Sequence, residues 1–169
     1  MTEQLPFTVV KKYADFEVRH YPDYLLAQTQ QTGDFVAAGY RGFQPLFQFI
    51  TGRNEQSQKI SMTAPVLQRE TADRTHSVAF VMPASMTRDS MPQPSDAGVT
   101  TEFVPAHNVA VITFRGLWSE KLMREKADQL RKVVEREGLN PTGDVYVARF
   151  DPPWKPGFMK KNEVLLDLS

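Results

Sequence analysis

The fold is most clearly indicated by the stretch Ser119-Glu-Lys-Leu-Met-Arg-Glu-Lys-Ala-Asp-Gln-Leu-Arg-Lys-Val-Val-Glu-Arg-Glu-Gly138. Its apolar residues recur at the three- and four-residue spacing of one helix face: Leu122, Met123, Ala127, Leu130, Val133 and Val134. Ser119 is a natural N-cap, and Gly138 is a natural stop signal. The pattern predicts a helix near residues 119–137, with one face packed on a core and the opposite, charged face in solvent.

Strand patterns flank this helix, and the same order of elements occurs earlier in the chain. We expect strands in the second half near residues 99–104, 108–115, 144–150 and 163–168. The first half is expected to hold a helix near 34–51 and strands near 15–21, 24–32, 59–68 and 77–83. The second set follows the first at a nearly constant offset, so that Lys59 corresponds to Asp144.

This repeat of pattern predicts an α+β fold. We expect two pseudo-symmetric ββαββ halves that form one twisted, barrel-like mixed sheet, with both helices packed against it, in a single domain of residues 1–169. Pro45 lacks an N–H group, so we expect a kink or break within the first helix. Residues 84–98 show no periodicity and are typical of a linker between the halves.

The composition excludes several classes of function. Lys plus Arg and Asp plus Glu both number 20, and neither half is basic, so nucleic-acid binding has no electrostatic support. The absence of cysteine excludes disulfides, thiol nucleophiles and thiolate ligands. The first thirty residues hold no signal-peptide core, and no apolar run approaches about 20 residues. We therefore expect a soluble cytoplasmic protein without a membrane span.

The sequence holds none of the common catalytic fingerprints. GxSxG, Walker A and GxGxxG motifs are absent. The three histidines, His20, His76 and His107, lack the spacing of metal ligands and have no accompanying carboxylate cluster. A structural zinc site is therefore not expected.

Several segments, taken in order, resemble the SOUL/haem-binding protein family. They are Ala14-Asp-Phe-Glu-Val-Arg-His-Tyr-Pro22, Lys59-Ile-Ser-Met-Thr-Ala-Pro-Val66, Val78-Ala-Phe-Val-Met-Pro83 with Met91-Pro-Gln-Pro-Ser95, and Asp151-Pro-Pro-Trp-Lys155 with Asn162-Glu-Val164. The resemblance extends from about Tyr13 to Leu168. It implies a non-enzymatic binding protein for haem or a related tetrapyrrole that buffers, carries or presents its ligand. The implied cofactor is non-covalent haem b, and another flat apolar small molecule is the alternative ligand.

Haem needs an apolar slot for the macrocycle, polar groups for its propionates and, often, an axial ligand. His20 stands where some family members carry a histidine that resembles an axial ligand, so the resemblance implies that His20 binds the haem iron. The expected contacts to the rest of the cofactor are Arg41, Phe43, Phe47, Met62, Phe80 and Met82.

Glu163 is the other residue with a possible chemical role. A carboxylate within an apolar strand is costly unless it is paired, so we expect an ion pair with Arg19 or Arg149. The paired ββαββ layout also resembles gyrase-inhibitor-like small-molecule-binding domains. That resemblance implies an alternative function, an enzyme or sensor in which Glu163 acts as a general base.

Overall fold

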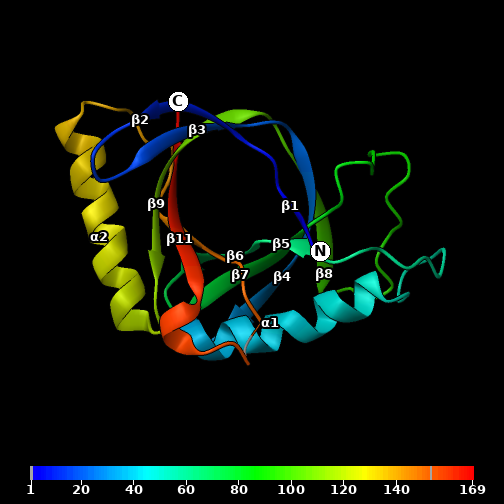
Figure 1. Cartoon of the computed structure of the whole chain (residues 1–169). Coiled ribbons are helices and arrows are strands. Elements are labelled where there is room, and N and C mark those ends of the chain that lie inside the picture. The colour runs from blue at the N-terminus through cyan, green and yellow to red at the C-terminus, as the bar shows by residue number, and fades with distance from the viewer. Residues whose placement is uncertain (1, 153) are drawn as a thin grey trace. The chain divides into compact units, whose positions relative to one another are not determined.

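Strands and two long helices build an α+β structure, the class that the sequence predicts (Figure 1). The computed structural model describes all 169 residues except residues 1 and 153. These residues divide into two units. Unit 1 holds residues up to Leu5 together with Asp23–Pro105, and unit 2 holds Pro6–Pro22 together with Ala106–Ser169.

Unit 1 contains an antiparallel sheet with the strand order β8-β4-β7-β6. Its elements are β4 (Tyr24–Thr32), α1 (Phe35–Ile50), β6 (Val66–Ala72), β7 (Thr75–Val81) and β8 (Val99–Val104). Helix α1 packs mainly on β7 and β4. Short strands β1 (Glu3–Gln4) and β5 (Thr63–Ala64) pair in parallel.

Unit 2 contains an antiparallel sheet with the order β2-β3-β9-β11-β10. Its elements are β2 (Thr8–Lys12), β3 (Glu17–Tyr21), β9 (His107–Arg115), α2 (Glu120–Arg136), β10 (Tyr146–Arg149), the short 3-10 helix η1 (Gly157–Met159) and β11 (Lys161–Leu168). Helix α2 contacts β11 and β9 and buries Met123, Leu130, Val133 and Val134, as its apolar stripe predicts.

The units do not coincide with the two halves of the sequence. Strand β3 comes from the first half but pairs with β9 in unit 2. Strand β8 comes from the second half but pairs with β4 in unit 1. Residues 84–98 lie entirely within unit 1, where Met91 is buried and Glu55 N donates to Gln93 O over 3.0 Å. Their interpretation as a linker is therefore wrong.

Both helices begin at the caps that the sequence predicts. Asp34 Oδ1 accepts a hydrogen bond from Ala37 N over 2.8 Å, and Ser119 Oγ accepts one from Leu122 N over 3.1 Å. We expected a kink or break at Pro45; helix α1 continues through this residue as one helix, so the break is wrong. One missing hydrogen bond is outweighed by the burial of the helix face that contacts the sheet.

The strand expected near 59–68 begins later than predicted, at Thr63, and is divided at Pro65, which follows a cis peptide bond. Across the described part of the chain, no helix combines the length and the apolarity that crossing a membrane requires.

Candidate functional site

Helix α1 presents an aromatic face to solvent in unit 1. Tyr40, Phe43 and Phe47 are 50%, 41% and 46% exposed, although large aromatic side chains are usually well covered. The Phe43 and Phe47 rings stack with their centroids 5.8 Å apart, and Phe43 meets Phe80 of β7 edge-on at 5.2 Å. The residues that α1 buries are others, so Phe43 and Phe47 keep part of their ring surface exposed.

Most of the other predicted haem contacts lie in the same unit. Phe80 and Met82 are buried in the apolar core of unit 1, and partly buried Met62 packs against that core. Arg41 lies on α1, but its guanidinium turns to the helix start and donates to the carbonyl of Thr32. The structure thus brings Phe43, Phe47 and Phe80 into contact and directs Arg41 away from them.

His20 belongs to unit 2, whereas the six other predicted contacts belong to unit 1. It is exposed on β3, and its Nδ1 atom lies 2.8 Å from Oδ1 of Asn108 on β9. A proton on Nδ1 would be donated to this amide oxygen, which would leave the lone pair of Nε2 available to a metal.

The expected pairing of Glu163 with Arg19 is confirmed in unit 2. Arg19 donates from Nη1 to Glu163 Oε1 over 3.0 Å and from Nη2 to Oε2 over 2.8 Å. Thr113 Oγ1 donates to Oε2 over 2.9 Å, and Arg19 also donates to Glu17 and to the hydroxyl of Tyr21. Both carboxylate oxygens of Glu163 therefore accept hydrogen bonds within the protein.

Burial and charge affect the protonation of this network in opposite ways. Burial by itself would lower the pKa of the Arg19 guanidinium, but the hydrogen bonds and charge of Glu163 outweigh burial and raise it. Burial raises the pKa of Tyr21 to about 12. The network thus holds a fixed ion pair beside a neutral tyrosine at ordinary pH.

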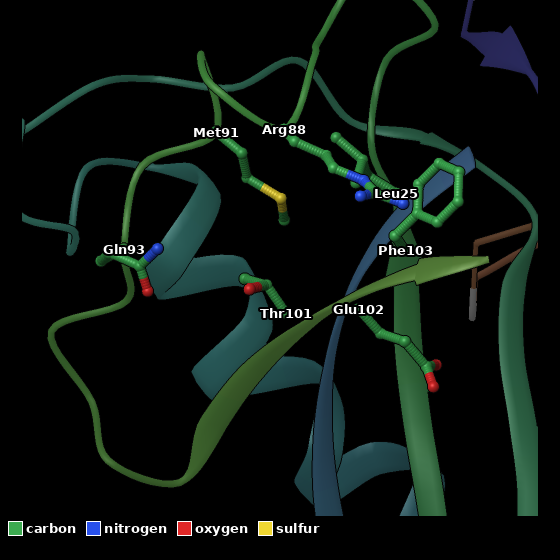
Figure 2. Close-up of a pocket in the computed structure, with 7 residues that line it drawn as sticks. All are labelled: Leu25, Arg88, Met91, Gln93, Thr101, Glu102 and Phe103. Atoms are coloured by element: carbon green, nitrogen blue, oxygen red, sulfur yellow. The ribbon is translucent and has the colours of Figure 1, made fainter. Parts of the chain in front are cut away.

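Unit 1 also contains a groove of about 430 Å³ that sequence reasoning missed (Figure 2). It lies between β4, β8 and the loop after β7, and its lining residues are Leu25, Arg88, Met91, Gln93, Thr101, Glu102 and Phe103. The segment that supplies Arg88 and Met91 was expected to be a linker. The motif Met91–Ser95, which carried part of the family resemblance, was the signal that could have directed attention to it.

The family model described as "SOUL heme-binding protein" matches residues 2–167, and this chain therefore belongs to the SOUL family. Heme-binding protein 2 of Mus musculus is 28% identical over 159 residues, which cover 89% of this chain and 77% of the mouse protein. The human protein of the same name matches with the same identity and coverage.

Solved structures share the fold at low sequence identity. The C-terminal domain of EcmrR is 14% identical, with a TM-score of 0.65 and coverage of 96% of this chain and 98% of that domain. A hydrolase from Listeria innocua is 12% identical, with a TM-score of 0.61 and coverage of 95% and 94%. SAV2435, solved with bound tetraphenylphosphonium, is 9% identical, with a TM-score of 0.51 and coverage of 92% and 94%. At these identities the similarity concerns the fold alone.

Proposed function

We propose that this chain is a cytoplasmic binding protein that holds haem b or a related tetrapyrrole non-covalently and releases it unchanged, as a buffer, carrier or presenter. Membership of the SOUL family and the names of the two mammalian relatives support this ligand class. The observation that carries the proposal is the exposed aromatic face of α1, formed by Tyr40, Phe43 and Phe47.

The residues of this face fit a flat apolar macrocycle. The rings of Phe43 and Phe47 are near-parallel, with 15° between their planes, and Phe80 contacts the Phe43 ring edge-on. Aromatic side chains bury about 150–250 Å² each when they are covered, which makes them strong contributors to contact with a planar ligand. We assign the macrocycle to this face and assign Met62, beside the unit 1 core, to its edge.

Haem also needs polar groups for its propionates, and Arg41 is the candidate on α1. Arg41 uses one nitrogen for the Thr32 carbonyl, and the remaining donors of its guanidinium can still meet a propionate. Bound haem would supply an iron that can accept a ligand from the protein. The iron ligand is a separate proposal that concerns unit 2 by itself: Asn108 can orient the His20 imidazole so that Nε2 is left to bind the iron.

The experiment is a spectroscopic haem titration of the parent and of Phe43→Ala/Phe47→Ala. We expect the dissociation constant to rise at least about tenfold, since about 1.4 kcal/mol of lost contact is enough. Val9→Ala/Val10→Ala is the matched control, because it truncates two exposed apolar side chains of β2 in unit 2. An unchanged affinity in the phenylalanine variant would remove the macrocycle from this face.

His20→Ala tests the iron ligand separately. Loss of an axial nitrogen should move the Soret maximum even where apolar contacts retain the macrocycle. An unchanged spectrum and affinity would show that His20 is not a ligand, and Met62 or Met82 would be the next residues to substitute.

A small-molecule enzyme or sensor that uses Glu163 is the second candidate. The burial of this carboxylate favours a special role, but its paired bonds to Arg19 and the bond from Thr113 support a structural one. Turnover of a small electrophile by the parent, lost in Glu163→Gln at unchanged stability, would favour the enzyme over the haem carrier.

A further inference from the structure

The groove of Figure 2 has the features of a second ligand site, distinct from the aromatic face of α1. Leu25 and Met91 are only 8% exposed and belong to the apolar core of unit 1, so they form a firm floor. Phe103 forms one wall, and the Thr101 hydroxyl and the Gln93 amide lie at the other end (Figure 2). The volume of about 430 Å³ lies within the range of small-molecule sites, about 300–1,000 Å³.

Arg88 provides the groove with a positive charge that the protein itself does not neutralise. Its guanidinium carbon lies 3.6 Å from the centroid of the Phe103 ring, which orients it by a cation–π contact. Within the described residues, no carboxylate pairs with Arg88 and no carbonyl accepts from it. Its five N–H donors are therefore available to a ligand.

Glu102, the single carboxylate among the lining residues, does not point into the part of the groove where an anion would bind. Thr101 and Phe103 alternate with Glu102 along β8, so Glu102 belongs to the other face of the strand. Figure 2 shows the Glu102 carboxylate pointing away from Met91 and Gln93. A ligand on the floor would thus meet Arg88 as its nearest charge.

From this arrangement we infer that the groove binds a small apolar carboxylate, an aromatic or alkyl acid with one negative charge. The apolar body lies on Leu25 and Met91 beside Phe103, and the carboxylate accepts two parallel hydrogen bonds from Arg88. The Phe103 ring holds the guanidinium in place before the ligand arrives, which lowers the cost of ordering it.

The test uses 2-naphthoate and 2-naphthamide, which share one apolar body and differ in charge. Binding is followed by NMR through the labelled methyl group of Met91, with the buried Met123 of unit 2 as an internal reference. Met91→Leu, a nearly volume-conserving change, assigns the signal. We expect saturable shifts at Met91, none at Met123, and an affinity for the acid about fivefold or more above that for the amide.

Arg88→Gln should abolish this preference and leave the weak amide binding unchanged. Lys132→Gln, which removes one exposed charge from α2, is the control and should preserve the preference. Equal affinities of the parent for acid and amide, absence of saturation, or an unchanged preference in Arg88→Gln would each overturn the inference.

The proposal for the groove and the proposal for the haem site can be refuted independently of each other. Phe43→Ala/Phe47→Ala should leave naphthoate binding intact, and Arg88→Gln should leave haem affinity intact. Competitive displacement of naphthoate by haem would overturn the inference, because the groove would then be part of the tetrapyrrole site.

Discussion

At the scale of single residues, the strongest constraint in this protein is the Arg19–Glu163 pair. Both side chains are almost fully buried, at 5% and 1% exposure, and two parallel hydrogen bonds join them. The cost of an unpaired carboxylate in an apolar strand was sufficient to predict that Glu163 has an arginine partner.

Glu163→Gln should destabilise the protein by about 3–5 kcal/mol, because it removes the buried partner of Arg19 and leaves only the partly exposed Glu17 carboxylate to pair with this charge. For a domain of this size about 2–4 °C is lost per kcal/mol, so we expect the melting temperature to fall by about 6 °C or more. Glu125→Gln, on the exposed face of α2, is the control for loss of one carboxylate. A Glu163→Gln protein that melts with the parent would contradict the structural role of this pair.

Tyr21 should make stability depend on alkaline pH. Burial raises its pKa from 10.0 to about 12, so the unfolded chain loses this proton first. The stabilisation is therefore complete below about pH 10 and is lost as the pH rises towards 12, by up to about 3 kcal/mol. We predict that Tyr21→Phe melts with a shallower pH slope in this window, measured by thermal scans against a Tyr13→Phe control. Equal slopes for the parent and Tyr21→Phe would show that Tyr21 titrates normally.

Other features of the two sites, among them the contact between Arg88 and Phe103, could not be predicted from the sequence. Arg88 lies in the loop after β7 and Phe103 on β8, and local periodicity does not encode a contact between a loop and a strand. Phe43 and Phe47 of α1 were predicted to be ligand contacts, whereas Tyr40 was not, and the structure supplies the exposure of all three. That exposure depends on how α1 packs on its sheet.

At the scale of elements, helix α1 depends on a close approach to β7 at Gly42. A β-carbon placed at Gly42 would lie 2.7 Å from Cβ of Val78, whose side chain is fully buried. The position therefore requires glycine for packing, although glycine weakens a helix. The packing of this face also explains why α1 continues through Pro45.

Gly42→Ala should lower the melting temperature by several degrees, although alanine favours the helix by about 1 kcal/mol. Overpacking typically costs about 1–3 kcal/mol, and here the backbones of α1 and β7 would have to separate. Gly143→Ala is the control, since nothing lies within 4 Å of its added β-carbon. In a double-mutant cycle, Val78→Ala should relieve part of the loss. Gly42→Ala melting at or above the parent would contradict this account of the contact.

The residues at which the helices begin could be predicted from the sequence, whereas the neighbours of the strands in the sheet could not. Asp34 and Ser119 cap their helices as expected, because a cap needs only residues within one turn. The exchange of β3 and β8 between the sequence halves was not predicted, since an alternating strand pattern does not identify its neighbour.

At the scale of the whole molecule, the α+β class followed from the order of strand and helix patterns, and the family followed from the ordered motifs. The EcmrR C-terminal domain and a Listeria innocua hydrolase share this fold at 14% and 12% identity, and a fold by itself does not identify a function. The proposed function must therefore be tested by measuring how the protein binds the ligand.

The most direct test of the central claim is a titration of the full chain with haem, followed by recovery of the ligand. We predict a saturable, red-shifted Soret band at a fixed stoichiometry and recovery of unaltered haem after prolonged incubation. Absence of a saturable shift, or conversion of the haem to another product, would contradict the proposal that this chain binds the tetrapyrrole without turnover.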